Sequence, residues 1–402
     1  MEVILELGEQ YLTGVFPKRP NQMLTRGPLT LARCRGCSLV QLLHSYDLNE
    51  LYGDHYGYRS SLNRSMVAHL HAKTSSLQNL VHLRPNDCLV DIGSNDGTLL
   101  SFYPEKQHLL IGFDPAGRKF RQYYRSDIEL VEDFFSAKLL RDRCGNRKAK
   151  LVTSIAMFYD LENPLLFMRE VESILDESGV WHFEQSYLPA MLRTNAYDTI
   201  CHEHLEYYAV RQIKWMTDRA GLKIIGIETN DINGGSFAVT VAKKGSSFHE
   251  DAAGIDRFLS EESRFGLDRS ETYEDFKRRI YLHRSQFLAK LGEIRNRGEK
   301  ILGYGASTKG NVILQFCGIT SQTLPYIAEV NQDKFGSFTP GTNIPIISEQ
   351  EAHAMNPECF LVLPWHFKSN VVEREAAFLR RGGKMIFPLP DLHTVGAEVL
   401  CI

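Results

Sequence analysis

Alternation of short apolar runs with longer amphipathic stretches is the sequence feature that most restricts the fold of this chain. Between residues 87 and 244, apolar runs bounded by Gly, Asp or Pro alternate with segments whose apolar residues recur at helical spacing. This alternation is typical of βαβ units, which build a parallel sheet covered by helices. We therefore expect an α/β fold with strands at 88–93, 109–114, 128–133, 151–156, 180–185, 222–228 and 236–244.

The last two expected strands are joined by only a few residues, 230–235. A connection of this length is too short for a crossover helix, so the two strands most simply pair antiparallel at one end of the sheet. Seven strands with a terminal hairpin favour the methyltransferase variant of the Rossmann sheet over an ordinary dinucleotide-binding sheet.

Three further parts surround this sheet, whose domain we place at 76–245. Residues 1–75 mix short apolar pieces with turns, which indicates a small irregular N-terminal domain. Residues 246–297 are rich in charge and have apolar residues at helical spacing, as in a helical connection. Residues 298–402 repeat the order strand, glycine turn and helix, so we expect a second, Rossmann-like α/β domain there.

The composition is that of a globular protein, and it limits the partners. The 402 residues are 43% hydrophobic and 24% charged, which excludes a disordered or fibrous chain. With 46 basic and 49 acidic residues the formal net charge is −3, which gives no reason to expect nucleic acid or an anionic membrane as partner. The chain shows neither a signal peptide nor an apolar run of the roughly 20 residues that span a bilayer. We expect a cytoplasmic protein that binds a small molecule.

Polar groups at the ends of successive strands predict a ligand site. The first strand is followed by a glycine turn, where a backbone without a Cβ can approach a ligand closely. Glycines that are needed only for the bend of the chain would give the same pattern. The second strand ends in Asp114, whose carboxylate can accept the hydroxyl protons of a ribose. The third is followed by Asp133 and Phe134, which suit the amine and the ring face of adenine. The candidate cofactor-binding residues are Asp91, Gly93, Ser94, Asn95, Asp96, Asp114, Pro115, Asp133, Phe134 and Ala156.

The glycine turn also distinguishes between nucleotides. It reads Gly-Ser-Asn-Asp-Gly from Gly93 to Gly97, whereas a dinucleotide fingerprint needs G-x-G-x-x-G to bring a helix N-terminus onto a pyrophosphate. Asp91 and Asp96 would repel a phosphate but suit the positive sulfonium and ammonium groups of S-adenosylmethionine. The turn therefore predicts S-adenosylmethionine rather than NAD.

Motifs along the whole chain resemble those of the S-adenosylmethionine-dependent sugar C-methyltransferases, which act on nucleotide-linked 4-keto-deoxysugars. The matching segments are LGEQYLTGVFP, CRGCSLVQL, YGYRSSLN, DIGSNDGTLL, ICHEHLEYY, NGGS, GYGASTKGN and PGTNIPI. The resemblance implies an N-terminal zinc module, a central class I methyltransferase sheet and a C-terminal Rossmann-like domain. It also implies that a nucleotide-linked sugar, the substrate, lies between these parts.

The zinc module departs from the family pattern, which has two C-x-x-C pairs. Here only Cys34 and Cys37 are present, and the first pair would precede LGEQYL, so the resemblance implies a truncated or alternatively started module. A structural zinc ion needs four ligands, usually thiolate or imidazole. His44 and His55 are the nearest substitutes, but their spacing is unconvincing. Two thiols on a turn without metal are therefore the competing interpretation.

The segment 197–208 holds the best catalytic candidates. C-methylation needs a base that removes a proton next to a ketone, and a histidine titrates in the right range. The resemblance assigns this chemistry to the pair Glu203 and His204, with His204 as the base. A metal site is disfavoured because the spacing H-E-H is not the H-E-x-x-H of metalloproteases, while a purely structural role for His202 and His204 stays open.

Two positions depart from the better-known members of the family. Cys201 stands where they carry a tyrosine, and Met157 lies near the position of a histidine. Either change alters how the ketone oxygen can be polarised. Tyr56, Tyr58 or Tyr159 would then supply the hydroxyl, or the substrate is a different sugar, and we include Tyr56 and Tyr58 among the catalytic candidates.

The candidate substrate-binding residues lie in two turns. One is the short connection before the last strand of the central sheet, and the other is a strand-to-helix turn in the C-terminal domain whose amides, hydroxyls and lysine could receive a diphosphate. Without the order G-x-x-x-x-G-K-[ST] this second turn is not a P-loop, and turns without any ligand are the alternative in both places. The candidates are Asn233, Ser236, Tyr304, Ser307, Lys309 and Asn311.

Two other function classes share most of these features. An O-methyltransferase for a nucleotide sugar would use the same cofactor turn but would activate a hydroxyl. A non-catalytic protein that binds nucleotide sugars would retain the pocket without the chemistry. The nucleotide, the sugar, the methylated carbon and the oligomeric state are open at the level of sequence.

Overall fold

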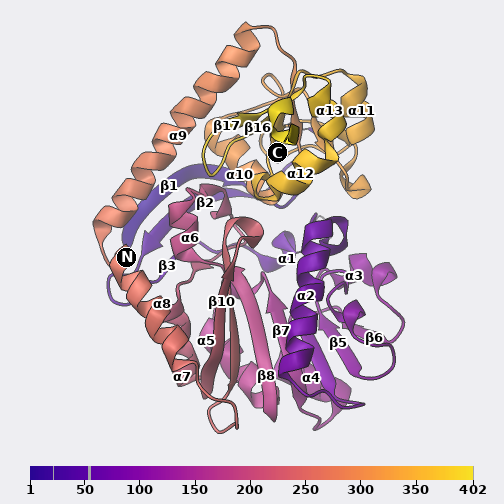
Figure 1. Cartoon of the computed structure of the whole chain (residues 1–402), viewed down its shortest axis with the longest axis vertical. Coiled ribbons are helices and arrows are strands. Elements are labelled where there is room, and N and C mark those ends of the chain that lie inside the picture. The colour runs from indigo at the N-terminus through magenta and orange to yellow at the C-terminus, as the bar shows by residue number, and fades with distance from the viewer. Residues whose placement is uncertain (21, 53–55, 402) are drawn as a thin grey trace.

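Three sheets make up the protein, as Figure 1 shows for the whole chain. The computed structural model describes residues 1–20, 22–52 and 56–401. The largest buried apolar cluster runs through all three sheets, with Leu31, Val90 and Leu361 as members from each. The sheets therefore share one core. Within the described residues, no helix combines the length and the apolar character that crossing a membrane requires.

The central sheet has seven strands in the order β10-β11-β8-β7-β4-β5-β6. The five strands from β4 to β8 run parallel, and β11 pairs antiparallel with both β8 and β10. This confirms the expected sheet with its antiparallel hairpin at one end. The bounds are β4 Cys88–Ile92, β5 Leu109–Phe113, β6 Ile128–Val131, β7 Ala149–Ile155, β8 Leu175–Ser186, β10 Leu222–Asn230 and β11 Ser236–Lys243.

Helices cover this sheet as the amphipathic spacing predicts. Helix α2 buries Met66, Leu70 and Leu77 against strand residues such as Leu89 and Leu110, so this part of the expected segment 1–75 packs on the central sheet. The helices between residues 48 and 219 are α1 Leu48–Leu51, α2 Arg64–Leu80, α3 Gly117–Phe120, α4 Ala137–Cys144, α5 Pro164–Ile174, α6 Leu188–Arg193 and α7 Val210–Arg219.

The N-terminal residues form a regular sheet, where the sequence suggested an irregular domain. Strands β1 (Glu2–Tyr11), β2 (Arg26–Arg33) and β3 (Val40–Leu42) pair antiparallel, and β9 (Glu206–Tyr207) adds the fourth strand. Because β9 lies far along the chain, this sheet fastens residues 1–42 to the segment that holds the catalytic candidates. A pairing over such a separation leaves no local signal in the sequence.

Two helices lead from the central sheet to the C-terminal domain. Helix α8 (Ala252–Phe265) is followed by α9 (Ser270–Asn296), whose inner face buries a helical series that includes Tyr273, Phe276 and Ile280. Figure 1 shows α8 beside the central sheet and α9 as a long diagonal helix that runs from beside the N-terminal strands to the C-terminal domain. This confirms a helix that ends near residue 297.

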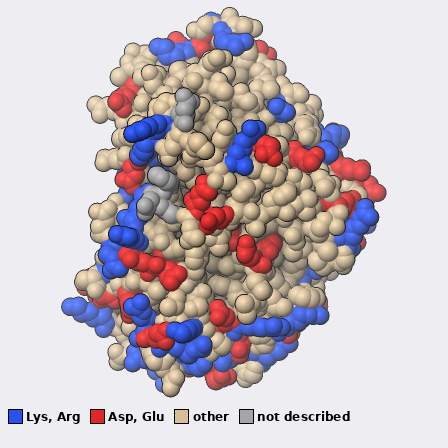
Figure 2. Space-filling model, turned by 180° about the vertical axis from the view of Figure 1, so that it is seen from behind, with Lys and Arg blue, Asp and Glu red and all other residues tan. Residues whose placement is uncertain are grey.

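The C-terminal domain is an open six-stranded sheet in the order β14-β13-β12-β15-β16-β17, in which only β17 is antiparallel. It confirms the expected second Rossmann-like domain. Its strands are β12 Ile301–Tyr304, β13 Ile327–Glu329, β14 Ile346–Ser348, β15 Cys359–Val362, β16 Lys384–Phe387 and β17 His393–Val395. Its helices are α10 Thr308–Cys317, α11 Glu349–Ala354, α12 Lys368–Arg374 and α13 Ala376–Arg380. Figure 2 shows acidic and basic side chains interspersed over the face seen from behind.

Candidate active site

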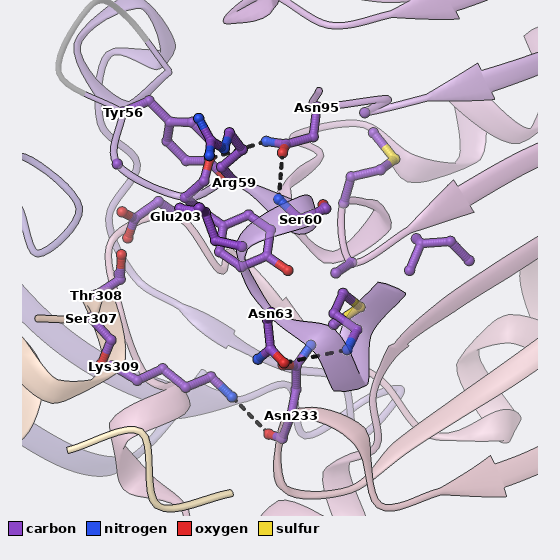
Figure 3. Close-up of a pocket in the computed structure, with 18 of the residues that line it drawn as sticks. Tyr56, Arg59, Ser60, Asn63, Asn95, Glu203, Asn233, Ser307, Thr308 and Lys309 are labelled. Atoms are coloured by element: carbon purple, nitrogen blue, oxygen red, sulfur yellow. Dashed lines mark hydrogen bonds between the residues drawn. The ribbon is translucent and has the colours of Figure 1, made fainter. Parts of the chain in front are cut away.

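One cavity of about 500 Å³ lies where the three parts of the chain meet. Its walls come from the carboxyl ends of β4, β5, β6 and β7, from residues within 48–52 and 56–70, from the segment around His204 and from the turn before α10. The cavity therefore joins the expected cofactor turn and four of the expected substrate residues, Asn233, Tyr304, Ser307 and Lys309, in one space. Figure 3 draws some of the side chains that line it.

The glycine turn after β4 has a backbone conformation and a packing that favour glycine at position 93. Gly93 has a φ of +76°, and a Cβ there would come within 3.1 Å of the Met157 side chain. The backbone N–H of Asn95 donates to Asp114 Oδ2 at 2.7 Å, and that of Ala116 donates to Asp114 Oδ1 at 2.8 Å. The two turns at the ends of β4 and β5 thus hold the Asp114 carboxyl rigidly against the cavity.

Two carboxyl groups in this part of the cavity resist ionisation. Burial raises the pKa of Asp114 to about 6, partly offset by the two backbone donors. Burial also raises the pKa of Asp91 to about 7, although the Thr153 hydroxyl donates to its Oδ1 at 2.6 Å. A ligand that brings positive charge or hydroxyl donors would favour the ionised form of both.

The remaining cofactor candidates line the same end of the cavity, with one exception. Phe134 exposes 40% of its surface, and its ring meets the Tyr52 ring edge to face, with 6.5 Å between centroids. Ser94, Pro115, Asp133 and Ala156 also line the cavity.

Asp96 is the exception, because both oxygens of its carboxylate accept hydrogen bonds from other residues of the protein. Its Oδ2 accepts from Ser61 N at 3.0 Å, and its Oδ1 accepts from the Thr98 hydroxyl at 2.6 Å. Asp96 therefore fastens the turn and does not line the cavity.

His204 lines the cavity as the free base. A ring nitrogen must be the donor toward a carbonyl, so Nδ1–H donates to Thr199 O at 2.8 Å and Nε2 keeps its lone pair. Burial and the nearby Lys309 charge lower the pKa of His204 to about 3. The Tyr159 ring lies against the imidazole, with 4.2 Å between centroids. The ring is therefore held neutral and in one tautomer.

His202 occupies a different environment. It is fully buried, meets the Tyr46 ring edge to face with 4.7 Å between centroids, and does not line the cavity. Among the described residues no three His, Cys, Asp or Glu side chains cluster as metal ligands would. Of the two histidines in this segment, His204 is the one whose position allows contact with a ligand.

Glu203 is a buried carboxyl with one unpartnered oxygen. Its Oε2 accepts from the Thr13 hydroxyl at 3.4 Å, and its Oε1 finds no partner. A Cβ on Gly14 would overlap Oε1, so a side chain there would displace the Glu203 carboxyl. Burial raises the pKa of Glu203. Figure 3 shows its carboxyl pointing toward Thr308.

The turn before α10 brings Lys309 to the central domain. The Ser307 hydroxyl caps α10 by accepting from Gly310 N at 3.0 Å, and the Lys309 ammonium donates to Asn233 O at 2.8 Å (Figure 3). No other hydrogen bond to that ammonium occurs among the described residues, which leaves donors for a ligand. Tyr304 also lines the cavity, and its hydroxyl donates to Glu375 at 2.8 Å.

Two of the expected substrate residues lie outside the cavity. The Ser236 hydroxyl donates to Ile232 O at 2.9 Å and closes the hairpin. The Asn311 amide donates to Thr13 O at 2.7 Å and fastens α10 to the N-terminal segment. Both are buried, so their polar groups serve the fold.

Tyr56 and Tyr58 both line the cavity, from the segment that follows α1. Burial, together with nearby carboxylates such as Asp114, raises the pKa of the Tyr56 phenol well above its usual range, so the group is a donor. Several further polar residues line the cavity that the sequence did not single out: Arg59, Asp160, Glu329, Lys334, His366 and Arg374. Arg59 lies in the segment YGYRSSLN, which resembles the family pattern but assigns this residue no role, and Glu329 ends β13. No motif marks the others.

Cys34 and Cys37 lie on the turn between β2 and β3, where Ser38 N donates to Cys34 O at 2.8 Å. Both thiols are free, and the described part of the chain brings no third ligand to them. His55, one of the substitutes considered, lies outside the described residues. Within the described residues, two thiols without further ligands do not fit a four-coordinate zinc ion.

Comparison with protein families divides the chain into three matches. A model described as "Putative zinc binding domain" matches residues 1–52, one described as "Methyltransferase domain" matches residues 63–227, and one described as "C-methyltransferase C-terminal domain" matches residues 231–390. Among curated proteins, C-methyltransferase NovU from Streptomyces niveus is 28% identical over 372 residues, which cover 92% of this chain and 88% of the relative.

Solved structures with partial similarity include two complexes. The plantazolicin methyltransferase BpumL, in complex with a desmethylPZN analog and SAH, matches with a TM-score of 0.34 and 11% identity. The match covers 44% of this chain and 84% of the BpumL chain. LepI in complex with SAM has a TM-score of 0.34 and 14% identity, and covers 46% of this chain and 54% of its own.

Proposed function

We propose that this S-adenosylmethionine-dependent C-methyltransferase methylates the carbon next to the ketone of a nucleotide-linked 4-keto-deoxysugar. The observation that carries the proposal is the placement of His204, whose free Nε2 faces the same cavity as the cofactor turn and Lys309. A base, a cofactor site and a cation for phosphate are the three parts that this chemistry needs.

The residues around the glycine turn fit the cofactor. When bound, S-adenosylmethionine supplies a methyl group on a positively charged sulfur. Asp114 would accept the ribose hydroxyls, Phe134 would cover the adenine, and the carboxyl of Asp91 would balance the positive charge. Gly93 would let the backbone approach the amino acid part closely.

His204 would act as the general base. With Nδ1 donating to Thr199 O, Nε2 can take the proton next to the ketone, and the new imidazolium would lie opposite the negative charge that develops on the substrate oxygen. The low pKa of His204 in the free enzyme keeps its imidazole unprotonated even at weakly acidic pH. Glu203, with an unpartnered oxygen, would hold a sugar hydroxyl.

Lys309 and the turn before α10 would hold the diphosphate of the substrate. Replacing Lys309 by alanine is expected to raise KM for the nucleotide sugar about tenfold or more, because one charge-assisted contact is lost, with little change in cofactor affinity. Steady-state kinetics and calorimetry with S-adenosylmethionine measure the two effects. Lys384→Ala is the control, because Lys384 is a partly exposed lysine of the same domain that pairs with Glu299 and lies outside the cavity. An equal loss for both ligands would indicate a folding defect and contradict the assignment.

Cofactor affinity is expected to rise with pH. Asp114 and Asp91 have raised pKa values in the free protein, about 6 and about 7, and binding favours their ionised forms. Binding therefore releases protons, and the affinity falls by about tenfold per pH unit for each group below its pKa. Between pH 7.5 and 5.5 we expect a loss of at least about tenfold by calorimetry, with proton release seen in buffers of different ionisation enthalpy. An affinity that stays constant over this range would contradict the role of both carboxyls.

Hydrogen exchange with solvent separates the proposal from its alternatives. In deuterated buffer the wild type should introduce deuterium at the carbon next to the ketone, since His204 removes that proton reversibly. An O-methyltransferase would transfer a methyl group without this exchange, and a binding protein would do neither. Methyl transfer without deuterium exchange at this carbon would contradict the proposed mechanism.

A further inference from the structure

Asp160 lines the cavity and has no part in the mechanism described so far. It ends the 3₁₀ turn Phe158–Asp160, which follows β7 at the carboxyl edge of the central sheet. The Tyr52 hydroxyl donates to Oδ2 at 2.6 Å, and Oδ1 is buried without a hydrogen-bond partner. Buried polar atoms are nearly always partnered, so the free oxygen points to a ligand contact.

The wall that carries Asp160 also carries the proposed base. The neighbouring Tyr159 lies against the His204 ring, and its backbone oxygen accepts from Leu205 N at 2.9 Å. Of the other residues on this wall, Met157 has no hydrogen-bond donor and Cys201 has only a weak thiol donor. With Tyr159 and Glu203, Asp160 is therefore one of the polar groups that line the cavity near His204.

Its surroundings keep the Asp160 carboxyl protonated. Burial raises its pKa well above the usual range, the nearby Glu203 and Glu206 raise it further, and the Tyr52 hydrogen bond offsets only part of this. None of the described lysines, arginines and histidines forms an ion pair with it. The groups that face it are Tyr52, Tyr56, Tyr159, Cys201, Glu203, Glu206, Tyr207 and Tyr208. Because Oδ2 accepts from Tyr52, the proton belongs on Oδ1.

We infer that Asp160 donates its Oδ1 hydrogen to the ketone oxygen of the substrate and stabilises the negative charge that forms there. The inference rests on the proposed function. As the C–H bond breaks, the proton goes to His204 Nε2, the C–H electron pair forms the new C=C bond, and the carbonyl π pair moves onto the oxygen that Asp160 holds. A neutral carboxylic acid in an apolar site is a suitable donor for this purpose.

Two substitutions of Asp160 test whether the side chain acts as a hydrogen-bond donor: one keeps a donor at this position and the other removes it. In Asp160→Asn, Tyr52 would donate to the amide oxygen and so turn the amide N–H groups toward the position of Oδ1. In Asp160→Ala no donor is left. We expect the alanine variant to lose about 10²- to 10³-fold in kcat, the usual effect of removing one donor to an oxyanion, and the asparagine variant to keep most of the activity.

Two further readouts would not respond to a merely structural role. Deuterium exchange into the sugar without S-adenosylmethionine should fall in Asp160→Ala as much as kcat does, while cofactor affinity stays near wild type. The raised pKa means that the donor form is lost as pH rises through it, so wild-type kcat should fall as pH rises through that pKa and Asp160→Asn should lack that fall. Asp142→Asn, an exposed carboxyl on α4, is the control.

The outcomes distinguish the inference from the function on which it rests. Near-wild-type kcat and exchange in Asp160→Ala, with an active wild type, would overturn the inference alone. A loss of cofactor affinity equal to the loss in kcat, with unchanged exchange, would assign Asp160 to the cofactor and also overturn it. If the wild type neither introduces deuterium into any 4-keto sugar nor methylates one, both the inference on Asp160 and the proposed function are contradicted.

Discussion

Replacing His204 by asparagine is expected to lower kcat by about 10² to 10⁴, the usual contribution of a positioned general base, with cofactor affinity nearly unchanged. Asparagine can still donate to Thr199 O but has no basic nitrogen in place of Nε2. The variant should also fail to exchange the proton next to the ketone. Single-turnover kinetics with a nucleotide-linked 4-keto sugar measures the chemical step directly.

His202→Asn is the matched control, because His202 is a buried histidine two residues away that does not line the cavity. We expect it to lower Tm, since it removes a buried ring packed on Tyr46, and to leave kcat of the folded protein near wild type. If His204→Asn instead kept near-wild-type turnover, His204 would be structural, and the base would have to be sought among Tyr56, Tyr58, Tyr159 and Glu203.

Replacing Asp114 by asparagine is expected to weaken S-adenosylmethionine binding by about tenfold to a hundredfold, because a charged acceptor for the ribose hydroxyls is lost. Asparagine is the sharper substitution than alanine, since Asp114 is buried and two backbone donors depend on its oxygens. Alanine would leave those donors unpartnered and lower stability as well. Calorimetry gives the affinity, and thermal unfolding without ligand gives the stability.

Glu132→Gln controls for this change, because Glu132 follows the next strand but pairs with Arg121 and lies outside the cavity. Its affinity for the cofactor should equal that of the wild type. An unchanged affinity in Asp114→Asn would refute the assignment of the cofactor turn.

The central sheet could be predicted because its signals are local. Strands β4 and β5 are short apolar runs that are followed by Gly93 and Asp114, and the short connection before β11 fixes the antiparallel hairpin. The N-terminal sheet could not be predicted in the same way, since β3 pairs with β9 from residues 206–207. Pairing over that distance depends on tertiary packing and leaves no pattern in either segment.

The cofactor turn was predictable for the same reason, but the direction of each side chain within it was not. Asn95 and Asp96 are neighbours, and only Asn95 lines the cavity, because Asp96 accepts from Ser61 and Thr98. Asn311 likewise shares a helix with Lys309 but turns its amide to Thr13. Asp160 carries no motif at all, and only its burial beside Tyr52 and Glu203 distinguishes it.

The most direct measurement is the bond that the transferred methyl group makes. The wild type is incubated with S-adenosylmethionine labelled with carbon-13 in its methyl group and with a panel of nucleotide-linked 4-keto-deoxysugars, and the product is examined by carbon–proton correlation NMR. We expect the labelled methyl on the ring carbon next to the ketone. A labelled methyl on a sugar oxygen, or no labelled product from any 4-keto sugar, would contradict it.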